Sequence, residues 1–540
     1  MNDAKTNPCI RAGRHAVTAL LTVLAVVLLP MSAAARQGEA TEAADLPLGF
    51  TLEEIVALAQ ESDTDIHDLF YSLRPYDENN ACVLCHEDEA VEILDTGHFK
   101  WEGKVEGIVG LEGTVHGKKD LLNNFCIAVP SNEARCTQCH TGIGWRDKDY
   151  DFQNPANVDC LVCHDQSGTY SKEPKTAGAP PPSLDLNAVA RSVSIGSTPT
   201  RKNCIGCHAN AGGGNNVKHG DLSTNLVATT REYDVHMGTD GADLPCIACH
   251  DANHDPKSGA VNHGNAGMAL HSVHEGEMRQ CVDCHGSQQA VHRDTGVEHL
   301  LFSEGWHERL ACQTCHIPAI ARKDATKMEW YWSDAGQDIT PPTDPVTGKP
   351  TYDKMKGSFV WANDVRPVLR WYNGQWERKV IGVSDSYDTV PIPMAEPQGS
   401  YDDPKAMIYP FKLMRGNQPV DTVNQIVLVP HLFPGPAGPN AYWKEYQWGP
   451  ALQEGAAYAG QNYSGTYGFV DTTMLLTVNH EVAPAENALG NGGMPDACMD
   501  CHETEFVDWE ALGWTDDPLR GGNRHMVAPR PSTSATARLD

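Results

Sequence analysis

Sixteen of the eighteen cysteines in this chain of 540 residues occur as pairs separated by two residues, and a histidine directly follows each pair. Two thiols at this spacing can form thioethers with the two vinyl groups of one porphyrin, while the adjacent histidine ligates the iron. Each copy is therefore predicted to attach one c-type haem, giving eight covalently attached haems. The copies are Cys82, Cys85 and His86; Cys136, Cys139 and His140; Cys160, Cys163 and His164; Cys204, Cys207 and His208; Cys246, Cys249 and His250; Cys281, Cys284 and His285; Cys312, Cys315 and His316; Cys498, Cys501 and His502.

Zinc knuckles and redox-active cysteine pairs are the alternatives, because both use the same cysteine spacing. Neither of these needs a histidine directly after every pair. The repetition of the whole pattern therefore favours haem attachment.

Histidines outside the motifs can supply the second axial ligand of a low-spin haem, although a histidine taken at random is as often a surface or hydrogen-bonded residue. Sequence does not tell which histidine serves which haem. The candidate second ligands are His98, His219, His236, His254, His274, His292, His307 and His480, with His263, His271, His299 and His431 in reserve.

The chain begins with a pattern typical of an export signal. Basic residues up to Arg14 precede an apolar run over 16–29, and small residues at 33–35 offer a cleavage site before Arg36. We therefore expect a signal peptide over 1–35 and a soluble periplasmic protein with no transmembrane segment after cleavage. An uncleaved anchor is the alternative, although the apolar run is short for a membrane span.

The motifs divide the rest of the chain. Residues 36–80 form a predicted helical arm, in which Thr51 and Glu54 make a capping box. Residues 81–316 carry seven motifs, too little chain for seven separate hydrophobic cores, so the haems should share one interior and stack closely enough to conduct electrons. We predict a mainly α fold with extensive irregular loops, organised around a stack of eight haems.

Residues 317–497 differ in composition from the rest, because they contain no cysteine and seven of the twelve tryptophans. Two runs with strand character, 368–372 and 375–380, flank Asn373-Gly374, a strong hairpin signal. We expect a haem-free insertion rich in loops and strands. Residues 498–540 then hold the eighth motif and a tail.

The formal net charge of -30 excludes a general role in nucleic-acid binding, because phosphate binding requires the opposite sign. An acidic exterior suits a basic soluble cytochrome or a membrane quinol-oxidising protein as electron donor. The sequence does not choose between these partners.

Catalysis needs a haem with an iron position open to substrate, and two residues could mark it. Cys126 is the one cysteine after the leader that lies outside the motifs, although buried inert cysteines are common. Lys218 follows a glycine-rich stretch, 212–214, that would let backbone approach a large planar group. The ordinary interpretation of such a lysine is a solvated surface charge.

Several stretches between the motifs carry a distinctive pattern. They are Asn123-Asn124-Phe125-Cys126-Ile127-Ala128-Val129-Pro130-Ser131-Asn132, Asn157-Val158-Asp159 before the third motif, Val217-Lys218-His219-Gly220-Asp221-Leu222, Asp234-Val235-His236-Met237-Gly238 and Ile317-Pro318 after the seventh motif. Together with the motifs, these stretches resemble the octahaem tetrathionate reductase family. The resemblance covers about 80–330 and the last motif.

This resemblance implies a periplasmic eight-haem reductase, distantly related to pentahaem nitrite reductases and hydroxylamine oxidoreductases, with its active site at the second haem. It implies a lysine ligand from elsewhere in the chain, matched by Lys218, and a cysteine beside the active haem, matched by Cys126. The second motif retains His140, where pentahaem nitrite reductases carry lysine. Whether His140 or Lys218 holds the iron is therefore open.

The predicted reaction is reduction of a small inorganic anion, with tetrathionate to thiosulfate favoured and nitrite or hydroxylamine as further possibilities. A thiolate at Cys126 could attack the central S–S bond of tetrathionate. Basic residues near the second motif could guide the anion, although they could equally be ordinary surface charge. They are Lys118, Lys119, Arg135, Arg146 and Lys148.

Two other functions compete with this prediction. A multihaem electron-transfer or storage cytochrome without its own substrate would have every iron ligated twice by the protein. Oxidation of hydroxylamine or hydrazine ranks third, because the 38 residues that follow His502 leave little room for the helical extension that this activity implies by resemblance.

Overall fold

The computed structural model describes residues 50–76, 80–250, 252–254, 261–265, 278–293, 306–435, 437–491, 496–502 and 504–524. Side chains at 80, 252–254, 261–265 and 306–307 are not described. The predicted leader over 1–35 lies outside these ranges.

Two helices, α2 (Leu52–Ser62) and α3 (Ile66–Leu73), form the N-terminal arm. The predicted capping box is confirmed, because the Glu54 N–H donates to Thr51 Oγ1 at 3.2 Å and the Thr51 N–H donates to Glu54 Oε2 at 2.8 Å. Ile55 and Phe70 bury their side chains against α9 (Leu186–Arg191). The arm thereby packs beside the first and third motifs.

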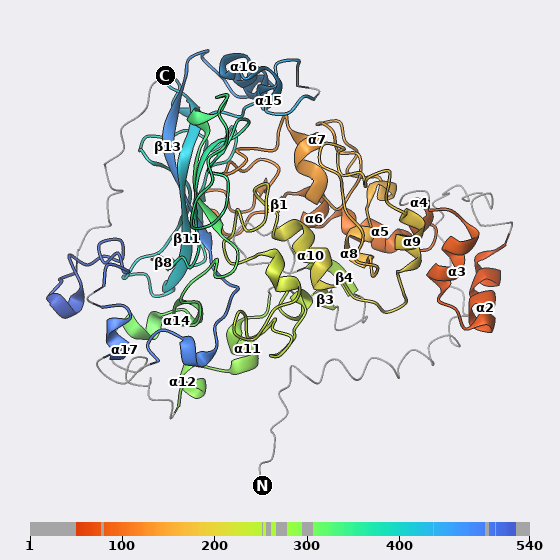
Figure 1. Ribbon diagram of the computed structural model, residues 1–540, viewed down its shortest axis with the longest axis horizontal. Helices are drawn as coiled ribbons and strands as arrows, with labels where there is room; N and C mark the ends of the chain where they lie inside the picture. The colour runs from red at the N-terminus through yellow and green to blue at the C-terminus, as the bar shows by residue number, and fades with distance from the viewer. Residues whose placement is uncertain are drawn as a thin grey trace, which may run out of the picture.

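Short helices carry most of the attachment motifs. They are α4 (Asn80–Val83), α7 (Glu133–Cys136), α8 (Leu161–His164), α10 (Arg201–His208), α11 (Cys281–His285), α14 (Cys312–His316) and α17 (Asp496–Met499). Between them lie α5 (Glu87–Leu94), α6 (Gly97–Lys100) and α12 (Gln288–Val291), and the two-stranded sheets β1 (Gly103–Lys104) with β2 (Val115–His116) and β3 (Ala252–His254) with β4 (Val261–Asn265). The motif-bearing helices extend from α17 and α14, below the large sheet, to α4 beside α3 (Figure 1).

A nine-stranded sheet is the largest element among the described residues, so the expectation of a mainly α fold is not confirmed. Its path runs β6-β7-β5-β11-β13-β10-β9, with β8 and β12 also paired to β11. The strands are β5 (Thr326–Tyr331), β6 (Tyr352–Asp353), β7 (Gly357–Ala362), β8 (Val368–Tyr372), β9 (Trp376–Arg378), β10 (Ile392–Pro397), β11 (Met407–Asp421), β12 (Ile426–Val427) and β13 (Tyr467–Thr477). All nine lie inside the predicted haem-free region.

The long strands β11 and β13 pair antiparallel from Phe411 opposite Thr477 to Asp421 opposite Tyr467. Almost every residue of β11 is buried, because other elements cover both faces of the strand. Helices α15 (Tyr442–Glu445) and α16 (Trp448–Tyr458) lie at the upper end of the sheet (Figure 1).

The predicted hairpin across Asn373-Gly374 is wrong in its pairing. Strand β8 pairs with β11, whereas β9 pairs with β10. Gly374 does adopt a positive φ of 94°, so the turn signal marks a real change of direction. The two flanking strands separate after the turn because each finds a longer partner in the sheet.

Candidate metal centres and active site

Five attachment motifs have their histidine ring opposite a second histidine ring. The centroids are 6.1 Å apart for His67 and His86, 6.1 Å for His98 and His208, 6.0 Å for His236 and His285, 6.3 Å for His250 and His480, and 6.0 Å for His292 and His316. An iron bonded to both imidazoles at about 2 Å would separate their centroids by roughly 6 Å. The rings therefore fit a haem iron between them.

Four of the candidate second ligands occupy these positions: His98, His236, His292 and His480. The partner of His86 is His67, which the sequence analysis missed. His67 Nδ1 lies 3.0 Å from Asp65 Oδ1. Because carboxylates often orient metal-ligating histidines, the aspartate two residues before His67 was the one sequence feature that could have marked it as a ligand.

Of the other candidates, the structure describes the side chains of two, and neither lies opposite a motif histidine. His219 is half-buried, and desolvation and then the neighbouring Lys218 hold its pKa far below the usual value. His431 is fully buried with Nδ1 3.0 Å from the Ser131 carbonyl and Nε2 3.1 Å from the Gly438 carbonyl, which is a structural role. Side chains of His254, His263 and His307 are not described, and His271, His274 and His299 lie outside the described residues.

Carboxylates orient several of these rings. His480 Nδ1 lies 3.3 Å from Asp221 Oδ2, which also accepts hydrogen bonds from the backbone N–H groups of Asn479 and His480. Burial disfavours the charged imidazole, but the hydrogen bond to Asp221 and the negative charges of Asp221 and Asp234 together outweigh it and raise the pKa of His480. Similarly, His502 Nδ1 lies 2.7 Å from Asp517 Oδ1. Such partners fix the orientation and increase the basicity of a metal-ligating histidine.

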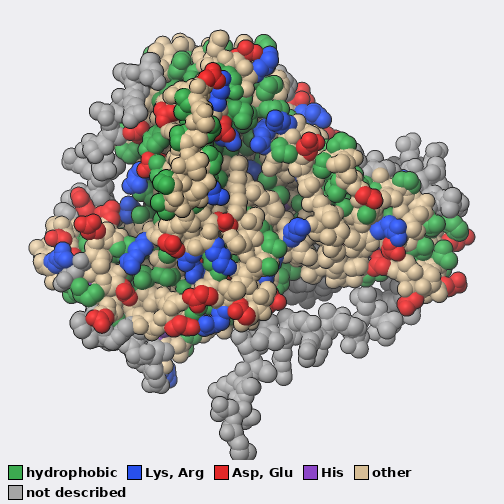
Figure 2. All heavy atoms as spheres, viewed as in Figure 1, with side chains coloured by type: hydrophobic (Ala, Val, Ile, Leu, Met, Phe, Trp, Pro, Cys, Tyr) green, Lys and Arg blue, Asp and Glu red, His purple; other side chains and the backbone are tan. Residues whose placement is uncertain are grey.

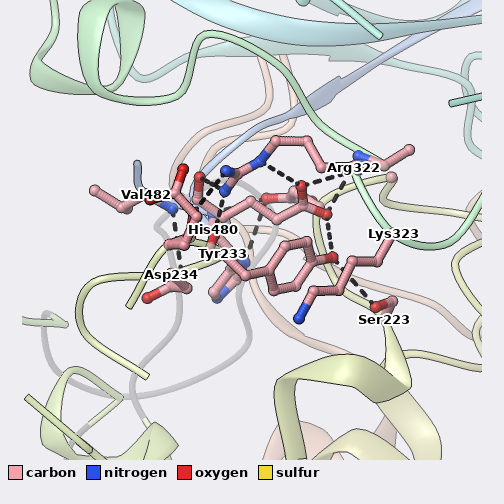
Figure 3. A network of polar contacts seen from close by, with 12 residues as sticks. Ser223, Tyr233, Asp234, Arg322, Lys323, His480 and Val482 are labelled. Carbon is pink, nitrogen blue, oxygen red and sulfur yellow. Dashed lines mark hydrogen bonds and ion pairs between the residues drawn. The ribbon is translucent and has the colours of Figure 1, made fainter. Parts of the chain in front are cut away.

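A buried network surrounds the His480 segment (Figure 3). Glu481 accepts hydrogen bonds from the Tyr233 hydroxyl at 2.6 Å and from Arg322 Nε at 3.2 Å. The Val482 N–H donates to Asp234 at 3.2 Å, and Asp234 also accepts from the N–H of His236, the ring opposite His285. One network therefore holds the candidate second ligands of the fifth and sixth motifs.

Cysteines of different motifs approach one another closely. Thiol contacts join Cys82 with Cys160, Cys139 with Cys207, Cys204 with Cys246 and Cys281 with Cys312. Each of these contacts joins two different motifs, so the attachment sites involved are neighbours. This spacing suits electron transfer between neighbouring haems.

The second motif differs from the others in its local backbone. In the first, third, fifth and eighth motifs the histidine N–H donates to the carbonyl of the first cysteine, but the His140 N–H donates to the Thr137 carbonyl. The tighter 3₁₀ turn redirects the side chain.

His140 is fully buried in an aromatic cage, and its Nε2 faces the Phe99 carbonyl instead of a second histidine. Burial, and then Lys172, lowers the pKa of His140 to about 3. The cage consists of Phe99, Trp101, Trp145, Tyr150 and Phe152. A ring held in this way is poorly placed to ligate iron.

Cys126 sits in a tight loop beside the second motif. The Asn123 side chain accepts hydrogen bonds from the N–H groups of Phe125 and Cys126 at 3.0 and 2.8 Å, and Ile127 has a positive φ of 65°. Asn124 Nδ2 donates to the Met414 carbonyl on β11 at 3.0 Å, which fixes the loop to the sheet. Burial raises the pKa of the Cys126 thiol, while nearby cations act in the opposite direction.

Lys218 approaches the same loop from another part of the chain. Its Nζ lies 5.8 Å from the ring centroid of Phe125, the neighbour of Cys126. Burial, then Lys118 and Arg378, lowers the pKa of Lys218 to about 8. A neutral amine is the form of lysine that can ligate iron, so this environment suits a ligand.

Strand β11 holds both loops. Lys412 is fully buried on this strand, and its Nζ donates to the Val217 carbonyl at 2.7 Å, the Lys218 carbonyl at 3.0 Å and Thr326 Oγ1 at 2.7 Å. All three donors of the ammonium are therefore used. Since Met414 lies two residues further on, one strand positions Lys218 and Cys126 together.

The predicted cationic group is only partly present at this site. The positive charges of Lys118 and Arg135 oppose the effect of burial on the pKa of Cys126. Lys327 and Lys356, which the sequence did not single out, act in the same direction. Lys119 pairs with Glu102 at 3.3 Å. Arg146 and Lys148 are exposed. Sequence proximity to the motif was therefore a poor guide, because two of the cations come from the sheet region.

We expect the variant His67→Ala to raise the number of carbon monoxide molecules bound by the reduced protein by one. Removing the ring opposite His86 would open one iron, and carbon monoxide binds open ferrous haems. Titration of the Soret band against total haem measures the count. His116→Ala is the matched control, because His116 pairs with Asp120 at 2.6 Å. An unchanged count for His67→Ala would show that His67 is not an iron ligand.

Comparisons with known proteins agree with these features. Residues 327–505 match the family described as bacterial cytochrome c. The crystal structure of octahaem cytochrome c from Shewanella oneidensis superposes with a TM-score of 0.72 and 36% identity, over 85% of this chain and 99% of that chain. An uncharacterised protein from Archaeoglobus fulgidus is 25% identical, over 35% of this chain and 77% of its own. Among the described residues, no helix has the length and apolar character needed to cross a membrane.

Proposed function

Because this chain belongs to the octahaem cytochrome c family, we propose that it is an exported reductase with eight covalent haems that reduces a small inorganic anion at the second of them. Tetrathionate is the favoured substrate, with nitrite and hydroxylamine as alternatives in the same class. The observation that carries the proposal is the second motif, where His140 is turned into an aromatic cage while Cys126 and Lys218 converge beside it.

Five of the other seven motifs support electron delivery. A haem with two imidazole ligands passes electrons without binding substrate, and five ring pairs have the required separation. When bound, the haems supply the electrons for the reduction. Contact between Cys139 of the second motif and Cys207 of the fourth gives electrons a route into the proposed active site.

Lys218 is proposed as the protein ligand of the active-site iron, since its Nζ comes from a loop fixed by Lys412. With Lys218 as its single protein ligand, that iron could bind substrate. Cys126 would then face the same substrate from its own loop. Each role is assigned to a side chain whose backbone is held by the sheet.

For tetrathionate, the Cys126 thiolate would attack one central sulfur and release the first thiosulfate. The product is a Cys126 S-thiosulfonate, in which the new S–S bond replaces the one that broke. Two electrons then cleave this bond, which regenerates the thiolate and releases the second thiosulfate. The step consumes two electrons and no protons.

Cations near Cys126 favour the approach of a dianion to a protein whose formal net charge is -30. On the face seen in Figure 2, by contrast, acidic and basic side chains are interspersed. We propose an electron-donor cytochrome or a membrane quinol-oxidising protein as the partner. The export signal over 1–35 would place the encounter in the periplasm.

The reduced protein is expected to bind one carbon monoxide for each eight haems. Only the iron at the second motif lacks a second protein ligand in this proposal, and the count follows from Soret titration against total haem. A count of zero would favour an electron-transfer or storage cytochrome without its own substrate. If one site is found, turnover assays with tetrathionate, nitrite and hydroxylamine identify the reaction.

A further inference from the structure

Arg378, the last residue of β9, is a buried cation without a hydrogen-bond acceptor or a carboxylate partner among the described residues. It is 7% exposed, and its Nε has no hydrogen bond. Burial alone lowers its pKa to about 10. Leaving a buried guanidinium without a partner is costly, so such a group calls for an explanation.

Other arginines that pack into the protein are well supplied with acceptors. Arg309 donates to backbone carbonyls that include those of Tyr401 at 2.6 Å and Ala406 at 2.9 Å. Arg322 donates to Glu481 Oε2 at 3.2 Å and to the Glu232 carbonyl at 3.0 Å. Arg378 is thus an exception within this fold, and packing of the sheet does not account for it.

The position of Arg378 places it beside the proposed active site. In β9, Trp376 and Arg378 are buried and Glu377 is exposed, so the guanidinium lies on the inner face of the sheet. The next residue, Lys379, accepts at its carbonyl from the Leu122 N–H at 2.9 Å. Leu122 directly precedes the Asn123–Ile127 loop that presents Cys126.

Two further positively charged side chains, Lys218 and Lys118, lie near Arg378. Arg378 and Lys118 both act on the ammonium of Lys218, and Lys118 also acts on the thiol of Cys126. Three cations therefore lie close enough to act on one another beside the two loops, and no carboxylate is among the groups that act on Lys218. An anion is the ligand that such an arrangement stabilises.

We propose that Arg378 binds the terminal sulfonate of a polythionate substrate, with two N–H groups of the guanidinium donating hydrogen bonds to two sulfonate oxygens. Arginine suits this role because its guanidinium presents paired N–H donors in the geometry of an oxyanion. The sulfonate would be anchored at Arg378 while the central S–S bond lies toward Cys126. This inference rests on the proposed reductase function and names its substrate class and a binding residue.

The test uses the purified holoprotein with the variants Arg378→Gln and Arg378→Lys. We expect KM for tetrathionate to rise roughly ten- to hundredfold in Arg378→Gln, since a charge-assisted hydrogen bond is lost, with kcat changed far less. Arg378→Lys keeps the positive charge but lacks the planar pair of N–H donors, so its KM should lie between the values for wild type and Arg378→Gln. Turnover of uncharged hydroxylamine, where present, should be unaffected.

Arg415→Gln is the matched control, because Arg415 lies on β11 of the same sheet with an exposed side chain. A KM for tetrathionate unchanged in Arg378→Gln would overturn the inference. So would a shift in the reduction potential or spectrum of the active haem without a change in KM, because that result would assign Arg378 to a haem propionate.

A second readout separates this inference from the proposed function. Thiosulfate, the product, is titrated into the oxidised protein and followed by its effect on the Soret band. Weaker binding to Arg378→Gln than to wild type would support the oxyanion site even if wild type does not turn over tetrathionate, in which case only the proposed reaction fails. Equal binding to both proteins would overturn the inference.

Discussion

Replacing Lys218 with alanine is expected to lower substrate turnover by at least about a hundredfold while leaving all eight haems attached. The attachment cysteines are not altered, so the haem content measured per protein should be that of wild type. The active-site iron, however, would lose its proposed protein ligand. His140 cannot readily replace it, because its Nε2 faces the Phe99 carbonyl inside the aromatic cage.

Electron paramagnetic resonance of the oxidised variant should show a changed signal from one haem and unchanged signals from the others. Lys218→His is informative beside it, because an imidazole can restore ligation if the loop held by Lys412 still presents the side chain. Lys444→Ala is the matched control, since Lys444 is exposed and pairs with Glu445 at 2.9 Å. Wild-type turnover and a wild-type spectrum in Lys218→Ala would contradict ligation by Lys218. His140 would then be the favoured ligand of the active-site iron.

Much of the chemistry was predictable from sequence because it is local. A haem attachment motif needs only five consecutive residues, and the capping box at Thr51 needs four. Cys126 and Lys218 stood out for similar reasons, one as an isolated thiol and the other beside a glycine-rich stretch. Their neighbours could not be predicted, because Lys412 is 194 residues from Lys218 along the chain and Asn124 is 290 residues from Met414.

The size of the sheet could not be predicted from the sequence, for a physical reason. Strand β11 is buried on both faces, so its sequence does not alternate between apolar and polar residues, and it contains Pro410, Gly416 and Pro419. Such a segment resembles a loop when it is considered alone. The strand gains its stability from pairing with β13, and that pairing depends on residues far away in sequence.

The roles proposed for His67 and Arg378 also depend on residues that are distant in sequence, so sequence alone could not predict them. His67 lies in a helix before the first motif and becomes a candidate ligand only when α3 packs beside that motif. In the sequence, Arg378 does not differ from other arginines in strands. Only the structure shows that its buried Nε has no hydrogen-bond acceptor. Local patterns therefore predict the attachment sites, whereas the candidate second ligands and the proposed substrate contact depend on tertiary structure.

Replacing Cys126 with serine is expected to abolish tetrathionate turnover, because a hydroxyl is a far weaker nucleophile toward sulfur than a thiolate. The loop should survive the change. The bonds that shape it use the Asn123 side chain, the backbone N–H of Cys126 and the Asn124 contact to β11, and none uses the thiol. Carbon monoxide binding at the active-site iron should therefore match that of wild type, and hydroxylamine, if it is a substrate of wild type, should still be reduced.

The pH dependence of wild type gives an independent check. Burial raises the pKa of the Cys126 thiol above its usual value near 9, so the reactive thiolate is a minor species at neutral pH. Below that pKa the thiolate fraction grows about tenfold for each unit of rising pH, and kcat/KM for tetrathionate should increase toward alkaline pH. Wild-type turnover in Cys126→Ser would exclude attack by the thiol. It would leave the second motif as the active site, because the arguments from His140 and Lys218 do not depend on sulfur chemistry.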